Sequence, residues 1–574
     1  MKSLLKYLNN YKKETILAPL FKMLEAGFDL LVPLVVASII DSGIGKGDSA
    51  HILKMGGVLI MLAIVGLTVA LTAQYFAAKA AAGFGTELRH DLFKHIQSLS
   101  YSQLDHVGTS TLITRMTTDV NQVQAQVNMA IRLLLRSPFI VFGAMFMAFT
   151  VDAKAAMVFV VAIPVLSIIV YGIMLITIPM YKKVQKGLDQ IMMSTRDNLA
   201  GVRVIRAFNK QEAETKRYEE ENYFLYKTQM LAGRISTIMN PMTYVIVNGA
   251  IIGILWIGGK QVDTGVLSQG QVVALVNYMS QILVELIKLA GLIINIIKAL
   301  ACASRIEEVF QLKPGMEEGT RQAGETSEYI VEMEHASITY NESGEESLSD
   351  VNLTVKPGEM IGIIGGTGSG KSTLVQLISR FYDVTSGCVK IHGVNVKEYT
   401  YEALGRMISV VPQKALLFKG TIRSNMEWGK KDATDEEIIE AMKVSQSYEF
   451  VMQKENTIDA IVEQNGKNFS GGQRQRLTIA RAVVAKPEIL ILDDSASALD
   501  YVTDLKLRQA LRNLGNMTIF VVSQRTASIM DADKIVVLDD GQVMGIGTHE
   551  ELLKTCETYQ EIYESQNKSE EEGR

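Results

Sequence analysis

The sequence predicts a polytopic α-helical membrane domain joined through a linker to a soluble α/β domain. Long apolar runs fill residues 1–312, whereas the rest of the 574 residues resembles an ordinary soluble protein in composition. Six of these runs are about 20 residues long, enough to cross a bilayer as a helix. Beyond residue 328, predicted strands and helices alternate around a glycine-rich loop, as in a parallel-sheet domain.

The six candidate spans lie near residues 16–40, 54–78, 129–151, 155–178, 239–258 and 270–297. The short connections between spans carry one lysine each, whereas segments 79–128 and 180–237 are rich in lysine and arginine. Basic residues mark the cytoplasmic side of a membrane protein. We therefore expect a multi-pass protein of the plasma membrane with both termini in the cytoplasm.

Segments 79–128 and 180–237 contain no proline and keep helical apolar spacing. At about 1.5 Å per residue, their helices should run some tens of ångströms beyond the bilayer. We expect them to turn near Asp105–Thr111 and near Arg206–Lys210. A pair of solvated loops is the alternative.

Polar residues interrupt the apolar spans. Charged groups are costly in a bilayer and usually face a partner or a cavity. Glu285 and Lys288 are three residues apart on one helix, so they either neutralise each other or contact a substrate. The full set is Glu25, Asp29, Asn240, Asn248, Asn277, Gln281, Glu285 and Lys288.

A glycine-rich loop reads GGTGSGKST and contains the pattern G-x-x-x-x-G-K-S after an apolar strand. Its backbone N–H groups and the following helix N-terminus form an anion site. We expect Lys371 to reach the outer phosphates and the Ser372 hydroxyl to join the coordination shell of Mg²⁺. The sequence therefore predicts a nucleoside triphosphate site at Gly365, Gly366, Thr367, Gly368, Ser369, Gly370, Lys371, Ser372 and Thr373.

Two later segments carry a family resemblance. Ser470–Gln473 lies within NFSGGQRQR, and ILILDD follows at Ile489–Asp494. This order resembles the ATP-binding cassette (ABC) family, and the whole chain is similar to bacterial exporter half-transporters. The resemblance implies a transmembrane exporter domain at 1–312, a linker at 313–328 and an ABC nucleotide-binding domain at 329–564. The polar segment 565–574 is expected to be a disordered tail.

The resemblance also implies roles for single residues. Tyr340 matches the aromatic residue that stacks on adenine, and Gln413 matches the glutamine that contacts Mg²⁺ and the attacking water. Asp493 matches the Mg²⁺-associated aspartate. ATP and Mg²⁺ are therefore the expected cofactors. The signature residues, which would contact ATP held by the other subunit, are Ser470, Gly471, Gly472 and Gln473.

At two positions the chain departs from the family pattern. Asp494 stands where the family usually has the glutamate that polarises the attacking water, and Gln524 where it has a histidine. The shorter carboxylate is displaced by about an ångström, which can cost roughly a hundredfold in a positioned reaction. Glutamine cannot exchange a proton near neutral pH. We therefore expect a site that holds ATP and hydrolyses it slowly.

The signature is intact, so the chain should complete the active site of a second ABC half-transporter in a heterodimer. Its expected activity is ATP-driven export of small amphipathic molecules such as drugs, lipids or peptides. A homodimer with two slow sites and a siderophore-type importer with the exporter fold are the alternatives.

Two other classes fit the sequence less well. Six spans argue against a soluble cassette ATPase, and only Lys22 and Lys288 provide the intramembrane basic charge that a channel-like regulator would need. The net charge of −5 gives no indication of a nucleic-acid partner.

Overall fold

The structure, a computed structural model, describes residues 3–325, 327–340, 344–495, 498–515 and 517–571. The chain divides into two compact units, and each is described by itself. The first unit consists of residues 1–98 and 108–312. The second consists of residues 99–107 and 313–574, so a short segment from between the first spans belongs to it.

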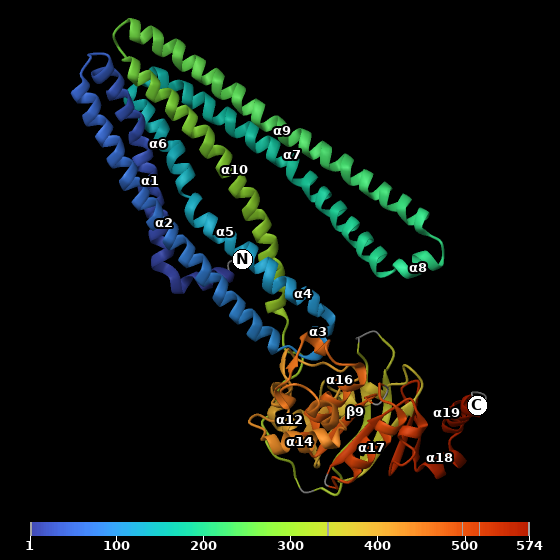
Figure 1. Cartoon of the computed structure of the whole chain (residues 1–574). Helices are drawn as coiled ribbons and strands as arrows, with labels where there is room; N and C mark the ends of the chain where they lie inside the picture. Colours follow the sequence, from blue (N-terminus) through green and yellow to red (C-terminus); the bar gives the residue numbers. More distant parts are fainter. Residues whose placement is uncertain (1–2, 326, 341–343, 496–497, 516, 572–574) are drawn as a thin grey trace. The chain divides into compact units, whose positions relative to one another are not determined.

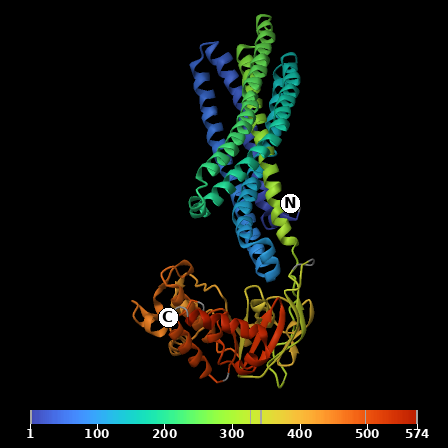
Figure 2. The ribbon, with the colours of Figure 1, turned by 90° about the vertical axis from the view of Figure 1, so that its right-hand side faces the viewer.

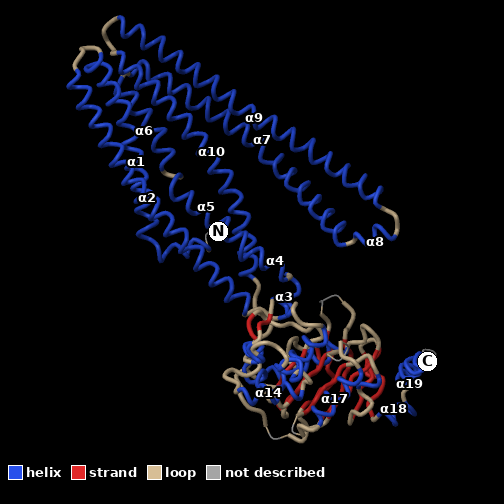
Figure 3. The backbone as a smooth tube through the Cα atoms, in the orientation of Figure 1, coloured by secondary structure: helices blue, strands red, loops and turns tan. Residues whose placement is uncertain are grey.

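The described residues of the first unit form helices and turns without a strand (Figure 3). Within the described part of the chain, six helical stretches are long and apolar enough to cross a membrane, and each contains one predicted span, which confirms the predicted fold class. The orientation across the membrane stays a prediction. The stretches are Leu4–Ile44, Ser49–Gln97, Thr109–Val151, Ala153–Ala200, Gln211–Asp263 and Gln269–Gln311.

Three long helices of the first unit begin at residues whose side chains cap them. The side chains of Asp48 and Asp152 accept hydrogen bonds from the first N–H groups of α2 and α7, and Ser268 and Gln271 form a capping box at the start of α10. The bounds (Figure 1) are α1 (Lys12–Ser38), α2 (Ser49–Gln97), α4 (Thr109–Thr114), α5 (Val120–Leu133), α6 (Arg136–Val151), α7 (Ala153–Ala200), α8 (Val202–Ala207), α9 (Gln211–Asp263) and α10 (Gln269–Gln311), with short 3₁₀ or π segments at Leu4–Tyr11, Ile39–Ile44 and Arg115–Asp119.

The helices continue through most of both predicted cytoplasmic connections. α7 and α9 are 48 and 53 residues long and run side by side (Figures 1 and 2). The chain turns at Gly108, which has a φ of +79°, and again through α8 and Asn209, which has a φ of +51°. The predicted turns are therefore confirmed, and the alternative of two solvated loops is wrong.

Asp119 ties the start of α5 to α10. Its carboxylate, only 2% exposed, accepts hydrogen bonds from Arg115 at 2.9 Å and from Arg305 at 2.5 and 3.1 Å. Because an arginine fork matches the two oxygens of a carboxylate, this contact fixes the two helices against each other.

The second unit contains a six-stranded sheet in the order β12-β11-β3-β10-β9-β6 and a four-stranded sheet in the order β2-β1-β4-β5. In the larger sheet only β12 is antiparallel. β3, β9 and β10 are buried along their whole length and almost entirely apolar, because both faces of this sheet are covered. The strands are β1 (Val331–Ile338), β2 (Leu348–Val355), β3 (Met360–Gly365), β4 (Ser386–Ile391), β5 (Val394–Asn395), β6 (Ile408–Val411), β7 (Gly420–Thr421), β8 (Ile461–Val462), β9 (Ile489–Asp493), β10 (Thr518–Val522), β11 (Lys534–Asp539) and β12 (Gln542–Gly547).

The helices of the second unit include α11, which leaves the phosphate loop, and α16, which begins at the signature. Their bounds, with those of the other α-helices, are α3 (Tyr101–Val107), α11 (Lys371–Ile378), α12 (Tyr401–Met407), α13 (Ile422–Met426), α14 (Asp435–Val444), α15 (Tyr448–Met452), α16 (Gly471–Val483), α17 (Tyr501–Arg512), α18 (His549–Thr555) and α19 (Glu557–Glu571).

The C-terminal helix corrects one expectation. α19 extends to Glu571, so residues 565–571 are helical where we expected a disordered tail. Glutamate, glutamine and lysine are good helix formers. Gln566 also hydrogen-bonds to the loop after β10, which holds this end of the helix. The last three residues lie outside the described part of the chain.

Candidate functional site

The phosphate loop connects β3 to α11 and requires its glycines. Gly370 has a φ of +93°, and a Cβ there would lie 2.8 Å from the carbonyl oxygen of Ser347. A Cβ on Gly365 would lie 2.1 Å from the carbonyl oxygen of Leu538. The loop can therefore close tightly against the neighbouring strands and present its backbone to a ligand.

Lys371 is the first residue of α11 and lies within the loop. Its Nζ donates to the carbonyl oxygen of Gly365 at 3.0 Å and to Ser369 Oγ at 3.3 Å. Burial lowers the pKa of Lys371, and the nearby carboxylates of Asp494 and Asp493 oppose that shift. The ammonium is thus placed at the positive end of a helix, as a phosphate site requires.

Asp493 ends β9 and faces the start of α11. Ser372 Oγ donates to Asp493 Oδ1 at 2.9 Å. Burial raises the pKa of Asp493; the Ser372 hydrogen bond counters this shift, and the charge of Asp494 adds to it. A hydroxyl and a carboxylate at this distance are hard oxygen ligands, so the pair fits Mg²⁺.

Asp494 follows β9 with a φ of +44°, a left-handed conformation that aspartate adopts more readily than most residues. Its N–H donates to the carbonyl oxygen of Val522 at 3.1 Å, which ties the residue to β10. Its Oδ2 accepts a hydrogen bond from Gln413 Nε2 at 3.3 Å. The structure thus brings together two residues that are 81 positions apart.

Gln524 lies in the loop after β10, and α19 holds this loop. Gln566 Nε2 donates to the Gln524 carbonyl oxygen at 2.7 Å. Gln566 Oε1 accepts from both the N–H and the hydroxyl of Thr526, each at 2.9 Å. No motif in the sequence marks Gln566, because its partners are about 40 residues away.

One cavity of about 440 Å³ collects most of these groups. It also contains acidic residues that no sequence motif marks. They lie just before β2 and in the turn between β11 and β12, and only the register of these strands brings them to the cavity. The predicted residues that line it are Thr367, Gly368, Gly370, Lys371, Ser372, Thr373, Gln413, Asp493, Asp494 and Gln524, and the missed ones include Glu345, Glu346, Ser347, Asp540 and Gly541.

Tyr340 stands beside the helix that leaves the loop. Its hydroxyl hydrogen-bonds with Thr373 Oγ1 and with Gln376 Oε1, each at 3.1 Å. The edge of its ring packs against Tyr382 at a centroid distance of 4.9 Å. Tyr340 as a whole is 40% exposed, so the residue can contact a planar ligand.

α3 packs onto the same aromatic group. Tyr101 stacks on Phe381 at 4.6 Å, and Asp105 accepts a hydrogen bond from the Tyr382 hydroxyl. Burial, and after it the Asp105 carboxylate, raise the pKa of Tyr382. One continuous set of contacts therefore joins α3, through Tyr382 and Tyr340, to the start of α11.

The signature residues lie apart from the cavity lining. Ser470 is the N-cap of α16 and accepts from the Gln473 N–H, while the Gln473 side chain accepts from the Ser470 N–H at 3.0 Å. A Cβ on Gly471 would meet nothing within 4 Å. The helix N-terminus is therefore formed, and there is free space beside Gly471.

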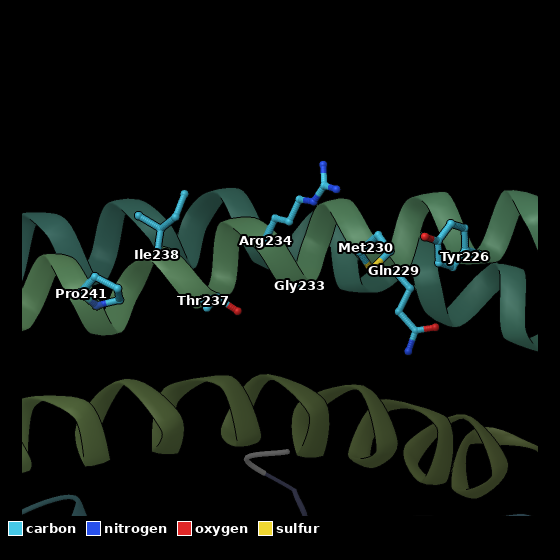
Figure 4. A pocket seen from close by; sticks show the side chains of 8 residues that line it. All are labelled: Tyr226, Gln229, Met230, Gly233, Arg234, Thr237, Ile238 and Pro241. Carbon is cyan, nitrogen blue, oxygen red and sulfur yellow. The ribbon is translucent and has the colours of Figure 1, made fainter.

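A hollow of about 770 Å³ in the first unit lies along α9 (Figure 4). All of its lining residues belong to this one helix. Gln229 and Arg234 point to opposite sides of it, so its polar groups do not converge. The lining consists of Tyr226, Gln229, Met230, Gly233, Arg234, Thr237, Ile238 and Pro241.

Two stretches of the chain match known families. Residues 15–286 match the ABC transporter transmembrane region, and residues 348–497 match the ABC transporter domain.

Relatives match nearly the whole chain. An uncharacterized ABC transporter ATP-binding protein of Mycobacterium tuberculosis (strain ATCC 25618 / H37Rv) is 36% identical over 98% of this chain and 97% of its own length. YgaD of Bacillus subtilis (strain 168), whose description proposes multidrug export, is 31% identical over 99% of both chains. An ATP-dependent lipid A-core flippase of Desulfotalea psychrophila is 32% identical over 84% of both.

A solved structure shares the fold. A bacterial Atm1-family ABC exporter with ATP bound aligns with a TM-score of 0.78 over 97% of this chain and 98% of that one. The sequence identity is 20%, so this likeness shows the fold alone.

Proposed function

Because this chain belongs to the ABC transporter family and joins a membrane region to an ATP-binding domain, we propose that it is one subunit of an ATP-driven exporter. Its own phosphate loop holds ATP and hydrolyses it slowly, and its signature completes the active site of a second, different half-transporter. The observation that carries this proposal is the composition of the 440 Å³ cavity, in which Lys371, Ser372 and other residues of the phosphate loop lie together with Asp494 and Gln524.

The ATP-holding side of the cavity is complete. The loop N–H groups and the Lys371 ammonium bind the phosphates, and the exposed Tyr340 ring stacks on the base. Ser372 and Asp493 would hold Mg²⁺, which supplies charge neutralisation on the phosphates when it is bound. These residues retain the nucleotide whether or not it is cleaved.

The hydrolytic side of the cavity is weak. The Asp494 carboxylate, with Gln413 beside it, accepts the hydrogen bond of the attacking water, but it is one methylene shorter than a glutamate. Gln524 can donate a hydrogen bond to the γ-phosphate, but it carries no positive charge there. Both groups therefore stabilise the transition state of hydrolysis less well than glutamate and histidine would, and ATP should remain intact for longer.

The signature serves the partner. ABC half-transporters work as dimers, in which one chain's signature faces the phosphate loop of the other. The open N-terminus of α16, with Ser470 as its cap, is suited to a γ-phosphate. A partner that carries the usual glutamate and histidine would form the fast site there.

The transported class is proposed from relatives described as a lipid A-core flippase and as a proposed multidrug exporter. We propose small amphipathic molecules, moved out across the plasma membrane. An importer built on the same fold and a homodimeric lipid or drug exporter are the alternatives. ATP-dependent dye accumulation in inverted vesicles supports export, whereas ATP-dependent loss from preloaded inverted vesicles supports import.

The proposed heterodimer, with one slow and one fast ATP site, is tested by measuring ATP turnover of the chain alone and together with the half-transporter encoded next to it. We expect the lone chain to be at least tenfold slower than the pair. Lone-chain turnover near 10 per second, a typical enzyme rate, would contradict the slow site. The variant Gly472→Asp blocks the signature without touching this chain's own cavity, so it should abolish most of the pair's turnover.

A further inference from the structure

A cluster of six charged side chains joins α1, α6 and α10 within the membrane unit. Three are acidic and three are basic, so their formal charges cancel. Arg136, at the start of α6, connects the others and was not among the residues that the sequence analysis singled out. The members are Lys22, Glu25, Asp29, Arg136, Glu285 and Lys288.

Four of these side chains form a chain of alternating charge. Arg136 donates to Asp29 Oδ2 at 3.0 Å through one terminal nitrogen and to Glu285 Oε1 at 2.6 Å through the other. Lys288 Nζ donates to the same Glu285 oxygen at 2.9 Å. The order Asp29, Arg136, Glu285, Lys288 therefore runs negative, positive, negative, positive.

Inside this series of charges the Glu285 carboxylate is fully paired, whereas Arg136 Nε is buried without a hydrogen-bond partner among the described residues. Glu285 is buried, and its second oxygen accepts a hydrogen bond from the Ser137 hydroxyl at 2.9 Å. Both of its oxygens are thus satisfied, as a buried carboxylate requires. Glu285 and Lys288 neutralise each other, as one of the two sequence-based alternatives stated, but Lys288 keeps further donors.

The two ends of the chain are open. The side chains of Asp29 and Lys288 are 46% and 45% exposed. Among the described residues, only one carboxylate oxygen of Asp29 accepts a hydrogen bond, and the Lys288 ammonium makes one of three possible bonds.

Both open ends line one cavity of about 500 Å³. Apolar side chains form part of its wall, and Gln281 Oε1 lies there buried, with no hydrogen-bond partner among the described residues. An unsatisfied buried acceptor is costly unless a ligand or water completes it. The cavity is lined by Asp29, Val32, Pro33, Arg136, Ile140, Asn277, Ser280, Gln281, Val284, Glu285 and Lys288.

We propose that this cavity binds an amphipathic zwitterion, with its cationic group on Asp29 and its anionic group on Lys288. Such a ligand continues the alternation of charge and closes the open chain into a ring. The apolar wall residues receive its hydrocarbon body. This inference rests on the proposed transport function and names the chemical class of the transported molecule.

A ligand of a single charge fits less well. A pure cation would pair with Asp29 and leave the remaining donors of Lys288 unused, and a pure anion would bind Lys288 and leave the second carboxylate oxygen of Asp29 without a hydrogen bond. Because charged groups in a membrane are costly without partners, a ligand that satisfies both ends is favoured over either. A zwitterionic lipid headgroup and a short apolar peptide with free termini share this chemistry.

The test compares three amphiphiles of equal chain length on the full chain in lipid nanodiscs, each below its micelle concentration. These are an alkylphosphocholine, an alkyltrimethylammonium and an alkyl phosphate, with binding followed by titration calorimetry. We expect the zwitterion to bind at least tenfold more tightly than the other two. Equal binding of all three, or stronger binding of either singly charged amphiphile, would overturn the inference without requiring any variant.

Variants locate the site. Asp29→Asn and Lys288→Gln should each weaken binding of the alkylphosphocholine about tenfold, because each removes one charge-assisted contact at a half-exposed group. The matched controls Asp263→Asn and Lys46→Gln change exposed charges elsewhere in the same unit and should leave binding unchanged. Binding that is insensitive to both test variants would place the ligand elsewhere.

A second arm identifies the source of the zwitterion and separates this inference from the proposed function. A leucine tripeptide with free termini is titrated beside the alkylphosphocholine, on the native chain and on both variants. If Asp29→Asn and Lys288→Gln weaken binding of only one of the two ligands, that ligand identifies the source as a peptide or a lipid. If they weaken binding of neither, the inference is overturned. ATP retention is measured on the same variants. Slow ATP hydrolysis with no zwitterion binding removes only this inference, whereas fast hydrolysis at the Asp494 site removes the proposed function.

Discussion

Lengthening one side chain should convert the ATP-holding site into a hydrolytic one. In the native chain, Asp494 Oδ2 lies 3.3 Å from Gln413 Nε2. The variant Asp494→Glu adds one methylene and so carries the carboxylate farther from the backbone. The added length brings the carboxylate toward the γ-phosphate side of the cavity. Asp494→Asn is the matched control, because it keeps the size and removes the charge.

Two opposing effects set the size of the gain. Correcting a displacement of about an ångström is worth roughly a hundredfold, or about 2.7 kcal/mol. Glutamate is less suited than aspartate to the φ of +44° at this position, which costs about 1 kcal/mol, or roughly fivefold. We therefore expect hydrolysis at this site to rise about twentyfold, and to rise at least tenfold further when Gln524→His is added.

The assay follows nucleotide held on this polypeptide in the assembled dimer. Photo-crosslinking with 8-azido-ATP labelled at the α- or γ-phosphate marks the chain whose cavity holds the base, and loss of γ-label alone reports cleavage there. The native chain should keep both labels, Asp494→Glu should lose γ-label about twentyfold faster, and Asp494→Asn should keep it at least as long. Equal γ-label lifetimes in the native chain and in Asp494→Glu would refute the reasoning that carboxylate reach limits this site.

Two further predictions concern residues that only the structure identifies. Asp119→Asn breaks a buried contact with Arg305, whose side chain is 39% exposed. We therefore expect the free energy of unfolding to fall by about 2 kcal/mol and the Tm in detergent to fall by a few degrees. The control variant Asp189→Asn changes an exposed carboxylate and should leave the Tm unchanged. An unchanged Tm in Asp119→Asn would show that the clamp is not structural. Gln566→Ala removes three hydrogen bonds from the loop of Gln524, each worth about 1 kcal/mol, so the Tm should fall by a few degrees and bound ATP should dissociate several-fold faster. Normal ATP retention in that variant would mean that α19 does not position the loop.

The role of α19 shows where composition misleads. The segment 565–574 is polar and charged, and such composition is typical of disorder. Gln566 nevertheless makes three hydrogen bonds to a loop some 40 residues earlier, and these long-range contacts outweigh the local preference. Segment 99–107 behaves similarly: it lies between two spans in the sequence but packs with the second unit through Tyr101 and Asp105.

The sequence by itself determined the elements whose signal is local. Six apolar runs predict six spans, because a helix forms all of its backbone hydrogen bonds within itself and can therefore cross a bilayer. GGTGSGKST predicts a phosphate loop, because its glycines allow the positive φ angles and the close backbone approach that such a loop needs. The tertiary structure alone decided which distant groups meet: Gln413 with Asp494, Gln566 with the Gln524 loop, and Arg136 with its two carboxylates. The physical reason is that strand register and helix packing, which no local pattern encodes, set the few ångströms over which hydrogen bonds and ion pairs act.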